Sequence, residues 1–306
     1  MQLFARKVNN FRLFDNHAWY VPGVGGIFAL LGWTVLGMLI GAMVQGLLII
    51  FLPMEVVKDY GAIITYPLQF LPAMIYAASK SRENSYFETG YKLDSNNWGP
   101  YNGWLLALVC ILLAYSLMFS ADLLNYANFK LTTSIPIMKE MYDVVIQAMQ
   151  QLTGGPLWAS LLVTAIFAPV FEEWLCRGMV LRGLLTRMKP GWAIVISALF
   201  FALIHFNPWQ ALNAFIIGMV MGFVYYKTGS LKLTMLLHFI NNASAVVLAH
   251  MPGEIDEQSF ILDLLPRSIY IPAYIAAVAV LIACLVIFAR IPLRDKRGNM
   301  DEIPAE

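Results

Sequence analysis

Long apolar segments are the feature that most limits how this chain can fold. Eight of them approach the ~20 residues that an α-helix needs to cross ~30 Å of hydrocarbon, although the fifth is short. They cover approximately residues 25–52, 61–79, 103–122, 157–180, 191–206, 209–226, 233–251 and 270–289. Since 59% of the residues are hydrophobic and only 13% are charged, a soluble domain is excluded. The sequence predicts an all-α, polytopic membrane helix bundle with about eight transmembrane helices.

The distribution of Lys and Arg predicts how the chain is oriented in the membrane. With the N-terminus inside, the inner loops and tails carry 15 of the 20 Lys and Arg, four lie outside, and the last is Arg177. Short loops rich in Lys and Arg stay in the cytoplasm, so both termini are expected to be cytoplasmic. The first apolar segment has no small-residue cleavage site and is expected to be a retained span. Short loops without a targeting signal indicate a prokaryotic cytoplasmic (inner) membrane.

Charge and cysteine content narrow the classes of partner. The formal net charge is +1, and no run of Lys or Arg is long enough to follow a phosphate backbone. We therefore expect membrane lipids and no nucleic acid among the partners. Cys110, Cys176 and Cys284 lie inside apolar segments, where cysteine behaves as a small hydrophobic residue rather than as part of a disulfide framework.

Three ionisable side chains interrupt the fourth apolar segment, in the stretch FEEWLCRG at 171–178. Each charged residue near a bilayer centre opposes insertion by roughly 2.5–3.5 kcal/mol. On a helix Glu173 and Arg177 share a face and can form an i,i+4 ion pair, whereas Glu172 projects about 100° away. The pair alone is equally well explained as a helix-packing contact. Glu172 has no such counter-ion, so it is the candidate for accepting and returning a proton.

Two further polar motifs occur on the following apolar segments. In FALIHF, His205 ends the segment and Phe201 lies one turn earlier on the same face. In HFINN, His238 and Asn242 are four residues apart and share a face, while Asn241 is a weaker candidate for this partnership. Taken singly, an interfacial histidine and interhelical hydrogen bonding explain these motifs. Together they favour a shared site with the glutamates, because polar groups in spans face a bundle interior or a cavity.

These side chains match a hydrolytic site without a serine or cysteine nucleophile. Glu172 can deprotonate a water molecule held by His205, and His238 with Asn242 can donate hydrogen bonds to the oxyanion of a tetrahedral intermediate. No H-E-x-x-H sequence occurs, so the signature of soluble zinc proteases is absent. This chemistry predicts hydrolysis of a peptide bond in a protein or peptide substrate in or at the membrane.

The order and spacing of the motifs resemble those of a known protease family. Glu-Glu-x-x-x-Arg at 172–177, Phe-x-x-x-His at 201–205 and His-x-x-x-Asn at 238–242 look like the three motifs of CPBP intramembrane proteases, the CAAX protease and bacteriocin-processing (Abi) family. The resemblance covers roughly residues 155–250. It implies helices that enclose a catalytic cavity, with catalytic roles for Glu172, His205, His238 and Asn242 and supporting roles for Glu173 and Arg177.

The resemblance also implies how the chain is organised. Residues 155–250 are expected to form the catalytic core. Residues 1–154 match no motif and are expected to supply transmembrane helices, an amphipathic segment near 137–152 and membrane anchoring only. Residues 251–306 are expected to form an outer loop, the last transmembrane helix and a cytoplasmic tail.

The resemblance leaves the metal and the substrate open. Family members are described both as glutamate-dependent proteases and as metalloproteases, and Glu172, His205 and His238 have side chains of the kind that ligate zinc. Zinc and a metal-free water mechanism therefore remain alternatives. A prokaryotic chain is not expected to trim prenylated CaaX ends, so the sequence does not name the substrate.

A protein without enzymatic activity is the alternative, either an immunity or scaffold protein or a small-solute transporter with the same bundle. Gly37/Gly41 and Gly218/Gly222 have G-x-x-x-G spacing, and Asp122 is a polar residue inside the third apolar segment. Close helix packing explains the glycines more simply, and no inverted repeat supports transport.

The positions of the two histidines along their segments conflict with straight parallel spans. At 1.5 Å per residue, His238 lies about 9 Å beyond Lys232, whereas His205 lies about 24 Å beyond Lys189. We expect helix tilt, a helix that begins below the membrane surface, or a broken segment lining a hydrated cavity to bring them level. We also expect water to reach the site from the cytoplasmic side, because Arg182, Arg187 and Lys189 place the end of the glutamate helix there and Lys227 and Lys232 place the start of the His238 segment there.

Overall fold

The computed structural model describes residues 20–80, 93–94, 96–139, 141–142, 144–145, 155–251 and 260–293. Within these ranges all regular secondary structure is helical. Seven helices are long and apolar enough to cross a membrane, which confirms the predicted all-α polytopic bundle. The chain is an integral membrane protein.

The long helices agree with seven of the eight predicted segments. They are α2 (Val24–Phe51), α3 (Met54–Lys80), α5 (Gly103–Thr133), a helix from Leu157 to Leu185, α11 (Pro208–Thr228), α12 (Leu231–Ala249) and α14 (Arg267–Ala289). The remaining segment forms α10 (Pro190–Leu203), whose 14 residues extend only about 21 Å. A short helix, α13 (Ile261–Leu264), precedes α14.

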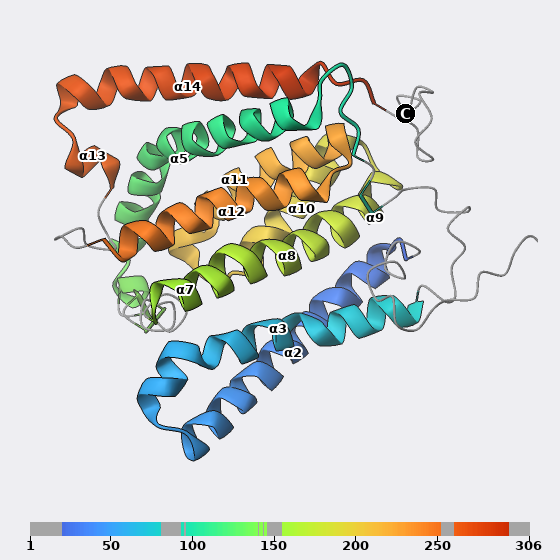
Figure 1. Ribbon diagram of the computed structural model, residues 1–306, viewed down its shortest axis with the longest axis vertical. Helices are drawn as coiled ribbons and strands as arrows, with labels where there is room; N and C mark the ends of the chain where they lie inside the picture. Colours follow the sequence, from blue (N-terminus) through green and yellow to red (C-terminus); the bar gives the residue numbers. More distant parts are fainter. Residues whose placement is uncertain are drawn as a thin grey trace, which may run out of the picture.

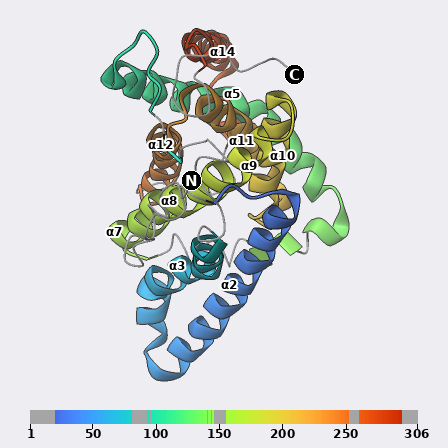
Figure 2. The same ribbon diagram turned by 90° about the vertical axis from the view of Figure 1, so that its right-hand side faces the viewer.

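The helices lie in successive layers (Figure 1). α14 and α5 form one side, and α10, α11 and α12 lie beneath them. The helix from Leu157 to Leu185 follows, and α2 with α3 forms the opposite side. The view turned by 90° shows the same order (Figure 2). α2 and α14 are the least buried of the long helices, which leaves their outward faces available to lipid. The helix that carries Glu172 is therefore central, covered from both sides.

Local sequence determines where the helices around the site begin and end. Asn207 caps α11 by accepting hydrogen bonds from two backbone N–H groups of its first turn, and Pro208 takes the first helical position. Gly229 ends α11 with φ of 61°, a left-handed conformation that glycine adopts without strain. Ser230 then caps α12 through the N–H of Leu233. Only the turn at 229–230 separates these two helices.

The G-x-x-x-G pairs lie at close helix contacts, as the packing interpretation predicted. A Cβ atom added to Gly37 would lie 2.1 Å from the carbonyl oxygen of Gln69 in α3. One added to Gly218 would lie 3.1 Å from the Cβ of Ala198 in α10. Small residues let helix backbones approach this closely. These glycines therefore give no support to a transport function.

Asp122 also has a structural role. Its carboxylate accepts hydrogen bonds from the backbone N–H groups of Ile261 and Leu262, at 2.9 and 3.0 Å, at the start of α13. The hydroxyl of Tyr270 donates to the same carboxylate at 3.1 Å. Asp122 thus joins α5 to α13 and α14, as expected for a side chain that satisfies free N–H groups at a helix start.

α12 begins inside the protein rather than at an exposed end. Thr228 and Ser230 have no exposed surface. The N–H of Asn97 donates to the carbonyl of Thr228 at 2.7 Å, and Ser230 donates to the Asn96 side chain at 2.9 Å. These contacts cover the turn between α11 and α12 within the protein, and the three explanations for the uneven histidine positions stay predictions.

Several predictions fall wholly or partly outside the described residues. In the predicted amphipathic segment, residues 136–139, 141–142 and 144–145 are helical, and the rest of it is not described. The N-terminal residues 1–19 and the loop at 252–259 also lie outside. Residues 81–92 and 294–306 lie outside as well, and with the N-terminal residues they hold eight of the 20 Lys and Arg residues, so the cytoplasmic position of both termini stays a prediction.

Candidate active site

The two glutamates lie in a helix that alternates between two hydrogen-bonding patterns. Glu172 and Glu173 end a short α-helical stretch that has a π-helix on each side. The order along the chain is α7 (Leu157–Ser160), η1 (Leu161–Phe167), α8 (Ala168–Glu173), η2 (Trp174–Leu181) and α9 (Arg182–Leu185), where η marks the π-helices. π-Helical turns are rare and often occur at functional sites.

Pro169 explains why a backbone carbonyl of η1 is available to another helix. The N–H of Ala168 bonds to the carbonyl of Val163, which is the i→i+5 pattern of a π-helix. The next residue in this pattern would bond to Thr164, but Pro169 has no N–H. Asn242 Nδ2 donates to the Thr164 carbonyl instead, at 2.8 Å. The predicted site residue Asn242 therefore ties α12 to η1 with one of its amide hydrogens.

Glu173 and Arg177 form the predicted ion pair. Arg177 Nη1 lies 2.6 Å from Glu173 Oε1, and neither side chain has exposed surface. Arg177 Nη2 also donates to the Gly218 carbonyl at 3.1 Å. The guanidinium carbon lies 4.5 Å from the centre of the Phe201 ring, a cation–π distance. The arginine thus connects the glutamate helix with both α10 and α11.

His205 lies in the turn after α10, not within the helix. α10 ends at Leu203, and Phe206 has φ of 47°, so the chain reverses direction before α11. His205 Nδ1 lies 2.7 Å from the carbonyl oxygen of Phe201. The two rings meet edge to face with 4.7 Å between centroids. The predicted shared face of Phe201 and His205 is confirmed.

His238 lies in the first half of α12, where its side chain is only 4% exposed. Its Nδ1 is 3.1 Å from Glu173 Oε1, and its ring contacts Phe201 with 5.5 Å between centroids. Asn241 donates to Asn242 Oδ1 at 3.0 Å, so its side chain supports Asn242 rather than the histidine. Phe201 therefore contacts both imidazole rings.

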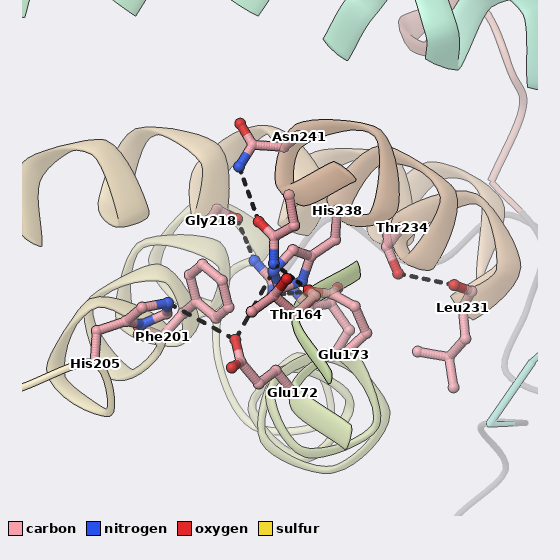
Figure 3. A network of polar contacts seen from close by, with 12 residues as sticks. Thr164, Glu172, Glu173, Phe201, His205, Gly218, Leu231, Thr234, His238 and Asn241 are labelled. Carbon is pink, nitrogen blue, oxygen red and sulfur yellow. Dashed lines mark hydrogen bonds and ion pairs between the residues drawn. The ribbon is translucent and has the colours of Figure 1, made fainter. Parts of the chain in front are cut away.

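Glu172 brings the motifs together (Figure 3). Its side chain points from α8 toward both histidines. Glu172 Oε2 lies 3.8 Å from His205 Nε2 and 3.9 Å from His238 Nε2. Oε1 accepts a hydrogen bond of 2.5 Å from the hydroxyl of Tyr66 in α3. Oε2 itself is buried and makes no direct hydrogen bond to the described part of the chain.

The hydrogen-bond partners of each Nδ1 determine whether the Nε2 atom that faces Glu172 is a donor or an acceptor. Each Nδ1 faces an acceptor, the Phe201 carbonyl for His205 and the Glu173 carboxylate for His238, so each Nδ1 carries a hydrogen. In a neutral imidazole the other nitrogen, Nε2, is then an acceptor, as is the oxygen of Glu172. With both imidazoles neutral, three acceptors would face one another and require a donor or a cation between them, whereas protonation of one imidazole leaves two acceptors and one donor. Their separations exceed a direct hydrogen bond and fit a bridging group such as water.

The same atoms are of the types that bind zinc. One carboxylate oxygen and two imidazole nitrogens are common zinc ligands, and the Nδ1 partners resemble the outer contacts that orient ligating histidines. Across the described ranges, however, no group of three or more His, Cys, Asp and Glu side chains has the arrangement of a metal site. The donor types are suitable but the required geometry is not in place, so no catalytic step is assigned to a metal.

The site is most open beside His205. The exposed fraction of the side chain is 23% for His205, 11% for Glu172 and 4% for His238. Thr234, one turn before His238, has no exposed surface, and the start of α12 is covered as described above. Of the three side chains His205 is therefore the most accessible, and entry of water from the cytoplasmic side stays a prediction.

Tyr66 is a site residue that the motifs did not reveal. It lies in α3, within residues 1–154, and donates a hydrogen bond to Glu172. This part of the chain therefore contacts a predicted site residue, in addition to the anchoring that was expected of it. A signal was present in the sequence, since Tyr66 precedes Pro67 inside an apolar span. A proline bends a helix, and a buried tyrosine hydroxyl needs a partner.

Together, the fold and the site define a class of protein: a polytopic α-helical membrane protein whose helices enclose two glutamates, two histidines and an arginine. Residues 154–244 match the family model Rce1-like, described as type II CAAX prenyl endopeptidase Rce1-like. This match confirms the resemblance to the CPBP/CAAX protease family and supports a CAAX-type intramembrane endopeptidase in general. No curated protein and no solved structure matches the chain.

Proposed function

We propose that the protein is an intramembrane endopeptidase that cleaves a peptide bond of a membrane-associated protein or peptide with a water molecule activated by Glu172. The observation that carries the proposal is the buried Oε2 of Glu172, which faces two imidazole Nε2 atoms at 3.8 and 3.9 Å. A water molecule that bridges these atoms would contact a base and two groups able to share its protons. The enzyme resides in a prokaryotic cytoplasmic membrane with both termini in the cytoplasm.

The mechanism that we propose uses a site in which His238 is protonated and His205 is neutral. Glu172 and Glu173 are buried carboxylates, and Arg177 supplies a single positive charge. A second positive charge makes the group neutral, which matters because an unbalanced buried charge is costly. His238 carries it, since its Nδ1 faces Glu173 and its ring is less exposed than that of His205. His205 is neutral and accepts a hydrogen bond at Nε2.

With these states, each atom has a role in hydrolysis. The water donates one hydrogen to Glu172 Oε2 and the other to His205 Nε2. Glu172 takes the first proton as the water oxygen bonds to the substrate carbonyl carbon, and the carbonyl electron pair moves to its oxygen. His238 Nε2–H and the free amide hydrogen of Asn242 donate to this oxyanion. The C–N bond then breaks, and the amine leaves with the proton that Glu172 had taken.

Glu173, Arg177 and Phe201 hold this arrangement in place. Glu173 accepts from both Arg177 and His238, so the ion pair orients the imidazole that carries the charge. Phe201 contacts both histidine rings with its own ring and His205 Nδ1 with its carbonyl. These residues act on the histidines and not on the substrate.

The proposal is tested with Glu172→Gln, His205→Ala and His238→Ala, and with Glu55→Gln, an exposed glutamate of α3, as the control. New protein termini in membranes from cells that express each variant are measured by mass spectrometry. Purified protein in liposomes is also incubated with an internally quenched, prenylated CaaX peptide. We expect the wild type and the control to create new termini and the three site variants to create none, while all remain monodisperse. Normal processing by all three site variants would overturn the proposal.

A chelator in the same assay distinguishes a metal-free water mechanism from zinc-dependent hydrolysis. Activity that persists in 1,10-phenanthroline supports the water mechanism. Loss of activity that Zn²⁺ restores instead shows metal dependence, for which Glu172, His205 and His238 are the candidate ligands.

A further inference from the structure

We propose that Tyr66 is a positioning residue that orients the Glu172 carboxylate for catalysis. This inference rests on the proposed function and extends the active site beyond the range 154–244 that matches the protease family. Tyr66 donates to Oε1 at 2.5 Å, while Oε2 faces the two histidines and has no direct partner in the described chain. The tyrosine therefore makes the two oxygens of the base unequal.

This inequality matters because the final torsion of a glutamate is soft. Rotation about χ3 is broad, so nothing in the glutamate itself fixes the carboxylate plane with one oxygen directed at His205 and His238. A hydrogen bond to one oxygen removes that freedom. Tyr66 thus holds Oε2 toward the imidazoles and reserves its lone pairs for the water proton.

Tyr66 is itself held by aromatic contacts that also reach the glutamate helix. It is 7% exposed and packs against Phe70 with 5.7 Å between ring centroids. Phe70 stacks on Phe171, at 5.4 Å and an interplanar angle of 11°. Phe171 directly precedes Glu172, so one continuous set of aromatic contacts fixes the donor and the acceptor relative to each other.

Two features of α3 favour a bend of its backbone next to Tyr66. Pro67 follows Tyr66 directly and removes one helical hydrogen bond, which bends a helix. Thr65 donates its hydroxyl to the carbonyl of Gly61 at 3.2 Å, a back-bond that also favours bending. Two residues after the proline, Gln69 meets Gly37 of α2 at the close contact described above. The packing of α2 against α3 thus helps to hold the Tyr66 hydroxyl at the site.

The role differs from that of a catalytic residue because Tyr66 contacts Oε1 and not the atoms that react. Its loss should leave substrate binding intact and lower the fraction of bound complexes in which Oε2 is aligned. The expected signature is a change in kcat without a change in KM. A purely structural role would instead lower stability and leave kcat of the folded protein unchanged.

The test compares Tyr66→Phe with Tyr225→Phe. Tyr225 is a matched control, since it is 3% exposed and its hydroxyl donates to the Leu93 carbonyl at 2.9 Å, away from Glu172. With a peptide that the wild type cleaves, we expect kcat of Tyr66→Phe to fall roughly ten- to a hundredfold, the range for losing a hydrogen bond to a charged group, with KM unchanged. Tyr225→Phe keeps the kcat of the wild type. Equal kcat values for wild type and Tyr66→Phe would overturn the inference.

An infrared measurement tests, without a substrate, whether Tyr66 orients the Glu172 carboxylate. The carboxylate stretch of Glu172 is assigned by its disappearance in Glu172→Gln. We expect this band to shift in Tyr66→Phe and to stay in place in Tyr225→Phe. An unchanged band in Tyr66→Phe contradicts the inference, whereas failure of the wild type to cleave any peptide contradicts only the proposed function.

Discussion

Replacing Arg177 with alanine isolates the contribution of the buried ion pair to stability. The substitution removes the 2.6 Å contact with Glu173, the 3.1 Å hydrogen bond to Gly218 and the cation–π contact with Phe201. Glu173 then keeps the 3.1 Å contact of its Oε1 with His238 and a contact with the Thr234 hydroxyl, both weaker than the lost ion pair. A buried carboxylate is left without its main counter-ion.

The loss of this counter-ion sets the expected change in the free energy of unfolding. Breaking one partner of a buried ion pair costs about 3–5 kcal/mol in soluble proteins, mainly because the remaining charge is unpaired. We expect a loss of that order in the free energy of unfolding for Arg177→Ala. Glu172→Gln is the comparison, since glutamine keeps an oxygen for the Tyr66 hydroxyl and loses a charge with no direct ion-pair partner at hydrogen-bond distance. For this variant we expect a change below about 1 kcal/mol.

The assay is equilibrium unfolding in mixed micelles with a rising fraction of SDS, followed by tryptophan fluorescence. Arg177→Lys keeps the charge but not the planar fork, and is expected to lie between wild type and Arg177→Ala. The double variant Glu173→Gln/Arg177→Met removes both charges and should recover part of the lost stability. If Arg177→Ala and Glu172→Gln are equally stable, Glu173 does not depend on Arg177 and the reasoning is refuted.

Two further predictions concern orientation and helix packing. Single cysteines at the exposed positions Ser134 and Lys189, in a background without the three native cysteines, should react with an impermeant thiol reagent from the outer and the cytoplasmic side, respectively; the reverse pattern would invert the topology. Gly37→Ala should lower both folded yield and activity, because its Cβ would lie 2.1 Å from the Gln69 carbonyl and push apart the helix pair that carries the tyrosine. Gly25→Ala, with nothing within 4 Å, is the control and should be neutral or stabilise by about 0.5–1 kcal/mol; equal losses for both would refute the packing argument.

Helix positions could be predicted because they depend on local sequence. A span is a run of apolar side chains long enough to cross the hydrocarbon, and seven of the eight predicted segments are long helices. The pairing of Glu173 with Arg177 and the contact of Phe201 with His205 were also predictable, since helix geometry places residues four apart on one face.

Other features needed information that no single segment contains. The sequence did not indicate that the turn before α12 is buried, where the N–H of Asn97 donates to the Thr228 carbonyl and Ser230 donates to the Asn96 side chain. His205 belongs to a turn after a short helix, which apolar periodicity alone did not separate from a span. Both depend on contacts between segments far apart in the chain.

The residues of the candidate site and the class of membrane bundle were determined by the sequence alone, since they follow from side-chain chemistry, hydropathy and spacing within single helices. Only the tertiary structure decided that one oxygen of Glu172 faces both histidines, that Asn242 bonds to a carbonyl left free by Pro169, and that Tyr66 donates a hydrogen bond to the other oxygen of Glu172. The physical reason is that a hydrogen bond between side chains 106 residues apart depends on how helices pack, and packing is a property of the whole chain.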